Sequence, residues 1–162
     1  MQQDPTTATP AVRGDGRRGW RRWGGWFAPL AVIGALWAFA LPAYSGPDEQ
    51  AHVTKAAAVA RGQWQGRHIE TVIGTLTEVE VPDVFGDRPA DLSKACFAGE
   101  PTVPADCATP PTGSTDDVVA GTYVGRYPPA YYGVVGLPTL VAPGTHTLVL
   151  MRLVSVVLGA AV

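Results

Sequence analysis

An uncharged apolar run near the N-terminus limits what this chain can fold into more than any other feature. Residues 26–44 read W-F-A-P-L-A-V-I-G-A-L-W-A-F-A-L-P-A-Y and contain no Asp, Glu, Lys or Arg. As an α-helix this run would rise about 28 Å, close to the ~30 Å thickness of the bilayer hydrocarbon. Pro29 lies in the predicted first turn, where a missing N–H costs little, and Pro42 lies at the exit. The run therefore predicts a transmembrane helix.

The same run has a second interpretation as a cleaved export signal, with Ala43-Tyr44-Ser45 as a small-x-small cleavage site. The run is longer than the usual apolar core of a signal peptide, and it carries Trp and Phe side chains in its interior. We therefore favour a retained helix, with Tyr44 as its outer aromatic anchor.

A basic tail precedes this helix. Residues 1–25 hold five Arg against two Asp and are rich in Thr, Pro and Gly, with almost no aliphatic side chains. Such a segment buries too little apolar surface to offset its ordering entropy, so we expect it to be disordered. By the positive-inside rule the tail stays in the cytoplasm, and residues 45–126 form an extracytoplasmic loop. Trp20, Trp23 and Trp26 suit the level of the lipid headgroups.

The charge distribution favours a membrane partner over nucleic acid. The net charge of −2 hides a basic tail and an acidic middle, because residues 45–126 hold twelve acidic against six basic side chains. A nucleic-acid interface would interleave basic and aromatic side chains along a folded face, whereas these arginines lead directly into the apolar run. We expect a lipid bilayer as partner and no nucleic acid.

A short acidic helix is predicted directly outside the membrane, over residues 47–61. Asp48 and Glu49 fall in its first turn, where the helix dipole favours negative charge, and Gly62 is typical after a helix end. Asp48 and His52, four residues apart, form a candidate proton-transfer pair; with Glu49 they are candidate ligands of a divalent cation. Ordinary capping and surface pairing would produce the same pattern. The position beside a membrane helix favours a functional role.

The outer loop holds a predicted β-region and both cysteines of the chain. Residues 69–81 are rich in Val, Ile and Thr with partial alternation, which predicts one strand or a hairpin around Gly74. Residues 82–121 show no periodicity and predict an irregular loop. On the outer side of a membrane, Cys96 and Cys107 are expected to form a disulfide.

The last part of the chain predicts an interfacial segment and a second membrane helix. Residues 127–143 contain an apolar stretch that is too short to span a bilayer and is interrupted by proline, so we expect a short helix among the headgroups. Residues 146–162 are largely apolar up to the last residue, which predicts the start of a second transmembrane helix in a longer or truncated chain. Arg152 within it is placed to snorkel, or to pair with Asp48 or Glu49.

Three short motifs in order carry a resemblance: P-D-E-x-x-H after the first helix, Y-P-P-x-Y-Y before the second, and R-L-x-S-x-x-x-G within it. Over residues 26–162 the chain resembles the N-terminal part of bacterial integral membrane proteins of domain-of-unknown-function family 2142 (DUF2142). It is more distantly similar to GT-C glycosyltransferases, which transfer a sugar from a polyprenyl-phosphate donor at the outer membrane face.

The resemblance implies roles for individual residues. Asp48 is the implied catalytic base, with Glu49 beside it as a candidate metal contact. The implied ligands are a divalent metal ion and a polyprenyl-phosphate-linked sugar. His52 matches the DUF2142 pattern and is included among the candidate catalytic residues, although the resemblance implies no role for it. Arg152 is implied to face a phosphate or the acidic loop. The residues implied to shape the donor-binding or interfacial region are Tyr127, Pro128, Pro129 and Tyr131.

Together these features predict a mainly α membrane protein. It has a transmembrane helix, an extracytoplasmic loop with a short helix and minor β-structure, an interfacial helix and the start of a second transmembrane helix. The implied function is a glycosyltransferase of the cell envelope, active only as a full-length multi-pass protein. Two alternatives stay open: a small two-helix membrane protein that partners a larger enzyme, and an exported soluble binding module.

Overall fold

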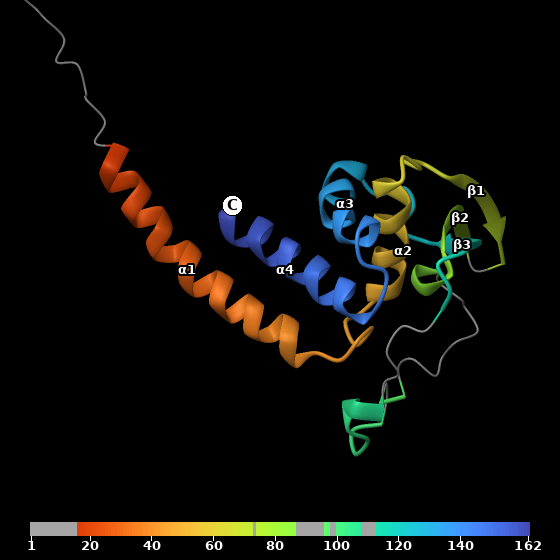
Figure 1. Ribbon diagram of the computed structural model, residues 1–162, viewed down its shortest axis with the longest axis horizontal. Coiled ribbons are helices and arrows are strands. Elements are labelled where there is room, and N and C mark those ends of the chain that lie inside the picture. Colours follow the sequence, from red (N-terminus) through yellow and green to blue (C-terminus); the bar gives the residue numbers. More distant parts are fainter. Residues whose placement is uncertain (1–15, 73, 87–95, 98–99, 108–112) are drawn as a thin grey trace, which may run out of the picture.

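The computed structural model describes residues 16–72, 74–86, 96–97, 100–107 and 113–162 of the chain. Two long helices, α1 (Gly16–Ala40) and α4 (Thr145–Ala161), lie side by side and form one arm of the molecule (Figure 1). The rest is a small α/β unit, in which α2 (Glu49–Ala60) contacts both a three-stranded sheet and α3 (Pro129–Val135). These four helices and one small sheet agree with the predicted mainly α class.

The two helices of the arm run antiparallel and in close contact. Near the start of α1, the indole Nε1–H of Trp23 donates to the Ala161 carbonyl at 3.2 Å. Near its end, Arg152 Nη1 donates to the Ala38 carbonyl at 3.1 Å. Between these points Gly34 permits the close approach, because a Cβ there would lie 2.7 Å from a side-chain carbon of α4. A small residue at a helix crossing lets two membrane helices pack backbone to backbone.

At its N-terminal end, α1 begins ten residues earlier than the apolar run. The predicted disorder of residues 1–25 is therefore wrong for residues 16–25, and the rest of the tail lies outside the described residues. The ring centroids of Trp20 and Trp23 lie 5.9 Å apart, and those of Trp23 and Phe27 lie 4.8 Å apart. Such pairs, three and four residues apart, stabilise a helix that composition alone does not predict.

The helix also ends earlier than predicted, at Ala40 instead of Tyr44. Pro42 has no N–H to donate, and proline disfavours helical backbone at the residue before it. Tyr44 has a left-handed backbone with φ 57°, and its buried hydroxyl donates to the Val84 carbonyl at 3.3 Å. Tyr44 therefore packs into the α/β unit, and its predicted role as the outer aromatic anchor of the membrane helix is wrong.

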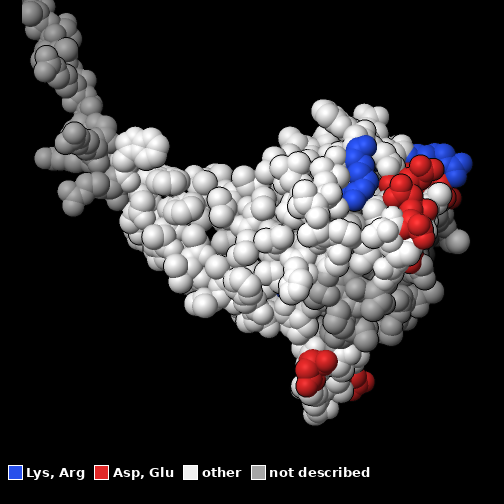
Figure 2. Space-filling view, viewed as in Figure 1, with Lys and Arg blue, Asp and Glu red and all other residues white. Residues whose placement is uncertain are grey.

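Among the described residues, one helix is long and apolar enough to cross a bilayer. Its 18-residue stretch Trp23–Ala40 has a mean hydropathy of 1.4. Only 6% of this stretch is buried inside the molecule, whereas the core helix of a water-soluble protein would be mostly buried. The apolar stretch of α4, His146–Ala161, is shorter. In the view of Figure 2 the charged side chains gather on the α/β unit and the projecting lobe below it, and the described surface of the arm is uncharged.

The sheet consists of β1 (Arg67–Thr71), β2 (Gly74–Pro82) and β3 (Asp117–Thr122), all antiparallel and in the order β1-β2-β3. The β1–β2 pair is the hairpin predicted around Gly74. The prediction of an irregular loop over residues 82–121 is wrong for the last residues of that range, which belong to β3. This short strand has no alternating pattern of its own. It forms by pairing with β2, and propensity is a poor guide to such a contact.

The core of the α/β unit surrounds α2. Three consecutive alanines, Ala56–Ala58, are buried, and their small side chains let α3 and the sheet approach. Gly136, directly after α3, lies so close that a Cβ there would be 2.1 Å from a backbone carbonyl oxygen of α2. Lys55 is also buried, and its ammonium donates to the carbonyls of Trp64 and Gly125 at 2.8 and 2.6 Å. Burial lowers the pKa of this lysine.

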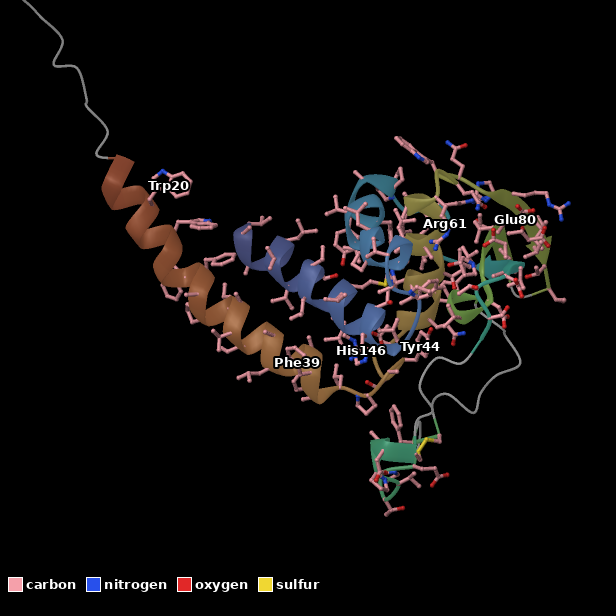
Figure 3. All side chains as sticks on the ribbon, viewed as in Figure 1. Trp20, Phe39, Tyr44, Arg61, Glu80 and His146 are labelled. Carbon is pink, nitrogen blue, oxygen red and sulfur yellow. A yellow bond between two sulfur atoms is a disulfide. The ribbon has the colours of Figure 1, made fainter. Side chains whose placement is uncertain are left out.

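The predicted interfacial segment, residues 127–143, contains α3 and a 3₁₀ turn, Leu137–Leu140. Its outer side exposes a set of aromatic and aliphatic side chains: Tyr127, Tyr131, Val134, Leu137, Leu140 and Val141. Figure 3 places Tyr44 and His146 at the junction of the arm with the α/β unit, and Trp20 at the far end of α1. The segment, which contacts α4 through both α3 and the 3₁₀ turn, presents apolar surface beside the arm, as is typical of an interfacial element.

A small lobe projects from the α/β unit (Figure 1). It is closed by a disulfide between Cys96 and Cys107, whose Cα atoms lie 6.2 Å apart. This is the pair expected to form a bridge on the outer side of a membrane. A disulfide of this kind persists in an oxidising compartment.

Candidate functional site

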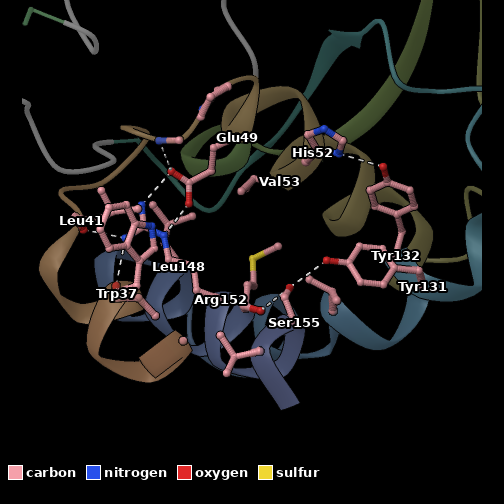
Figure 4. Close-up of a pocket in the computed structure, with 17 residues that line it drawn as sticks. Trp37, Leu41, Glu49, His52, Val53, Tyr131, Tyr132, Leu148, Arg152 and Ser155 are labelled. Carbon is pink, nitrogen blue, oxygen red and sulfur yellow. Dashed lines mark hydrogen bonds and ion pairs between the residues drawn. The ribbon is translucent and has the colours of Figure 1, made fainter. Parts of the chain in front are cut away.

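A cavity of about 340 Å³ lies where the arm meets the α/β unit (Figure 4). Both the arm and the α/β unit contribute apolar side chains to its lining, and the polar side chains come from α2, α3 and α4. The apolar lining includes Trp37, Leu41, Leu148, Met151 and Val156. The polar lining consists of Glu49, His52, Tyr131, Tyr132, Arg152 and Ser155. The cavity is therefore amphipathic.

Glu49 and Arg152 form a bidentate ion pair at this junction. Arg152 Nε donates to Glu49 Oε1 at 2.5 Å, and Nη2 donates to Oε2 at 2.7 Å. The Arg152 and Glu49 side chains are 13% and 16% exposed, so water screens the pair only weakly. Charge-assisted contacts at two points are among the strongest hydrogen bonds in proteins. Of the two acids considered as partners of Arg152, the structure selects Glu49.

The other donors of Arg152 bind the end of α1. Nη1 donates to the carbonyls of Ala38 and Leu41 at 3.1 and 2.6 Å, and Nη2 donates to the Pro42 carbonyl at 2.7 Å. All five N–H groups of the guanidinium are then engaged. These bonds satisfy carbonyls that a helix end leaves without partners. Arg152 thus joins α1, α2 and α4, and it has no donor left for the phosphate that the resemblance implied.

Asp48 lies outside α2 as its N-cap residue, with a left-handed backbone of φ 59°. The helix begins at Glu49, two residues later than predicted, because Asp48 breaks the helical backbone. The predicted proton-transfer pair of Asp48 and His52 is not formed: they are joined only by a backbone hydrogen bond of 3.2 Å. Asp48 is exposed, and its carboxylate pairs with no described residue. Aspartate tolerates this left-handed region better than most residues.

His52 contacts Tyr132 instead. The imidazole Nδ1 lies 2.8 Å from the phenol oxygen, and the two rings are nearly parallel, with an interplanar angle of 8° (Figure 4). Tyr132 is only 4% exposed. Burial, and then the neighbouring Tyr131 and Tyr127, raise the pKa of Tyr132 to about 12. The phenol therefore keeps its proton at physiological pH.

The Y-P-P-x-Y-Y motif places these tyrosines. Pro129 is the first residue of α3 and Pro128 is its N-cap, where a fixed φ favours the start of a helix. The hydroxyl of Tyr131 donates to Ser155 Oγ at 2.9 Å, and Ser155 donates to a carbonyl one turn earlier in α4. Tyr127 lies before the helix and stays exposed. Tyr131 therefore ties α3 to α4, which the sequence did not predict.

The acidic residues do not fit a divalent metal ion. Both carboxylate oxygens of Glu49 are engaged by Arg152, and Oε2 also accepts the Gly46 N–H at 3.4 Å. Within the part of the chain that the structure describes, no three His, Cys, Asp or Glu side chains are grouped to hold a metal ion. The candidate metal contacts Asp48 and Glu49 gain no support from this geometry, and no chemical step is assigned to a metal.

A family model with the description "Predicted membrane protein (DUF2142)" matches residues 30–162. The chain belongs to this family. The resemblance carried by the three motifs is thereby confirmed for DUF2142, and the family supports a membrane protein with a lipid bilayer as partner. No curated protein and no solved structure matches the chain significantly.

The DUF2142 match covers the whole cavity, since the first lining residue in the chain is Gly34. Of the polar lining residues, Tyr132 and Ser155 were not among the candidates named from the sequence. Tyr132 and Tyr131 are adjacent, and which of them faces α2 depends on where α3 begins. Ser155 lies three residues after Arg152 and so shares its side of the helix, and this spacing could have identified Ser155 as a lining residue.

Proposed function

We propose that the protein containing this chain is a membrane-bound glycosyltransferase of the cell envelope. Its donor is a polyprenyl-phosphate-linked sugar. The chain crosses the membrane more than once, with its N-terminus in the cytoplasm and the α/β unit on the outer face. The amphipathic cavity is the observation that carries this proposal.

The cavity suits a ligand with an apolar tail and a polar head. Most of the apolar lining comes from α1 and α4, the helices that continue into the bilayer under this proposal, and Val53 and Val135 add apolar surface from α2 and α3. The polar part comes mainly from the α/β unit, which lies in water under the same proposal. Binding sites for small molecules are commonly apolar with a few placed polar groups, and this cavity follows that pattern. A lipid-linked sugar would place its chain along the arm and its head beside α2 and α3.

Two features support the orientation. The Arg-rich tail precedes α1, and basic residues favour the cytoplasmic side. The Cys96–Cys107 disulfide belongs to the α/β side of the molecule, and disulfides persist outside the cytoplasm. Both support a position of the cavity at the outer face, where lipid-linked sugars would be used by an envelope enzyme.

Asp48 is the proposed general base. Its carboxylate would take the proton of an acceptor hydroxyl while that oxygen attacks the anomeric carbon and the bond to the carrier phosphate breaks. The electrons of that bond leave with the phosphate. Glu49 suits this role less well, because Arg152 engages both of its oxygens. Asp48 is exposed and its carboxylate pairs with none of the described residues, which leaves it able to meet an acceptor from the aqueous side.

The test is transfer of labelled sugar from a polyprenyl-phosphate donor by the full-length protein in membranes. Asp48→Asn should lower the rate at least a hundredfold, within the usual contribution of a general base, without changing the amount of membrane-bound protein. Asp116→Asn is the matched control, since Asp116 is also an exposed aspartate of the α/β unit. Transfer by Asp48→Asn at the native rate would rule out Asp48 as the base. No transfer by the native protein from any polyprenyl-phosphate sugar would remove the proposed reaction.

A further inference from the structure

Most polar side chains around the cavity have their hydrogens engaged by other groups. Arg152 gives its five N–H groups to a carboxylate and three carbonyls. The Tyr131 hydroxyl donates to Ser155, which donates to a backbone carbonyl. Apart from the indole N–H of Trp37, the donor that remains for a ligand is on His52. Its availability depends on which ring nitrogen carries the proton.

Tyr132 determines the position of that proton. Its oxygen lies 2.8 Å from His52 Nδ1, and no other described residue hydrogen-bonds the hydroxyl. Burying an O–H that has no hydrogen-bond acceptor costs free energy, and His52 Nδ1 is the acceptor within hydrogen-bonding distance. The Tyr132 O–H therefore donates to Nδ1. In the neutral imidazole the proton then lies on Nε2, which has no bond to a described residue.

We infer that Tyr132 holds His52 as the Nε2–H tautomer, so that this N–H can donate to a phosphate oxygen of a lipid-linked ligand in the cavity. The identity of the ligand rests on the proposed function, whereas the tautomer rests on the geometry alone. Tyr132 is a positioning residue, because it acts through His52. This role differs from the proton-transfer and metal-ligand roles that the sequence suggested for His52.

The charges nearby permit an anion at this position. Glu49, one turn before His52, has its charge balanced by Arg152 at 2.5 Å. Asp48 is exposed and is not among the residues that line the cavity. The phenol of Tyr132 stays protonated, because burial raises its pKa to about 12. An N–H donor in this largely apolar cavity would therefore meet a phosphate without an unbalanced acid beside it.

The tautomer is measured directly by ring ¹³C and ¹⁵N chemical shifts. The full-length protein is labelled on histidine and held in phosphatidylcholine nanodiscs, and the His52 signal is the one missing from His52→Gln. The native protein and Tyr131→Phe should both show the Nε2–H form, and Tyr132→Phe should show a mixture. Tyr131→Phe is the matched control, since it removes the neighbouring hydroxyl on the same helix. An Nδ1–H signal in the native protein, or no change in Tyr132→Phe, would overturn the assignment.

Ligand binding is measured on the same His52 signal by adding three probes in turn: a polyprenyl phosphate, phosphatidic acid and inorganic phosphate. The polyprenyl phosphate should shift the Nε2 resonance, and Tyr132→Phe should bind it about tenfold more weakly, as expected for one hydrogen bond. Asp116→Asn, which lies outside the cavity, should change affinity less than twofold. An equal shift with phosphatidic acid would support phosphate binding and assign it to bulk lipid. A shift with none of the three would overturn it.

Different results would contradict the proposed function and the assignment of His52. If Asp48→Asn keeps full transferase activity while the His52 tautomer and phosphate binding are as expected, the catalytic role of Asp48 is wrong and the assignment of His52 stands. If Asp48→Asn loses activity while the native protein shows the Nδ1–H tautomer, the assignment of His52 is wrong and the transferase proposal stands.

Discussion

Loss of the Arg152 side chain should loosen the attachment of the arm to the α/β unit. Removing one partner of a buried ion pair costs about 3–5 kcal/mol, and since both partners are slightly exposed we expect about 3 kcal/mol for Arg152→Met. Glu49→Gln keeps a hydrogen-bonding side chain and should cost about 2 kcal/mol. The double variant should cost about 3 kcal/mol, because once Arg152 is replaced, replacing Glu49 removes no further ion pair. The expected coupling energy of the pair is therefore about 2 kcal/mol.

The assay is reversible unfolding of the full-length protein in mixed micelles, with increasing SDS and far-ultraviolet circular dichroism as the readout. The matched control is the same double-mutant cycle on Arg67 and Glu78, an ion pair on the sheet whose side chains are 76% and 24% exposed. A surface pair of that kind should show a coupling of less than about 1 kcal/mol. If the pair of Glu49 and Arg152 shows no greater coupling than this control, the reasoning from burial and geometry is refuted.

Two further predictions concern α3 and its contact with α2. Tyr132 loses its proton near pH 10 in the unfolded state and near pH 12 in the native state. The difference stabilises the native state by up to about 2–3 kcal/mol below pH 10, and this stabilisation is lost as the pH rises to 12. Unfolding measured at pH 9 and 11.5 should show this loss in the native protein and not in Tyr132→Phe; equal losses would contradict it. Gly136→Ala should destabilise by about 1–3 kcal/mol, because its Cβ would meet a backbone carbonyl at 2.1 Å. Gly133→Ala on the same helix, with its nearest atom at 3.6 Å, is the control, and equal thermal shifts of the two variants would refute the clash.

Local features of the fold were predictable wherever a short stretch carried its own signal. The uncharged run from Trp26 identified the helix that is long and apolar enough to cross a membrane, and the Val- and Thr-rich residues around Gly74 indicated a strand or a hairpin. β3 was missed because the partner that makes it a strand lies on β2, with the disulfide-closed lobe between them in the sequence. The early start of α1 was missed because contacts between ring pairs such as Trp20 and Trp23 do not appear in composition.

The site was predictable in its members more than in its pairings. Helical spacing joined Asp48 to His52, but that spacing assumed a helix from residue 47. The helix begins at Glu49, after the left-handed residue Asp48. Glu49 pairs with Arg152, which was one of two expected pairings, and His52 pairs with Tyr132, which was not expected. These partners lie on α3 and α4, far along the chain, and no local period reports which helix will pack against α2.

The backbone at Asp48 separates two adjacent acids into different roles. Glu49 is the first residue of α2 and points to the guanidinium of Arg152, so it holds the cavity together. Asp48, one residue earlier and at positive φ, stays outside the helix and keeps its carboxylate exposed. This conformation also decides which substitution is informative. Alanine at position 48 would add the strain of a left-handed backbone to the loss of charge, whereas asparagine tolerates that backbone and removes the charge alone. A loss of transfer in Asp48→Asn can therefore be attributed to the missing carboxylate and not to a displaced Glu49.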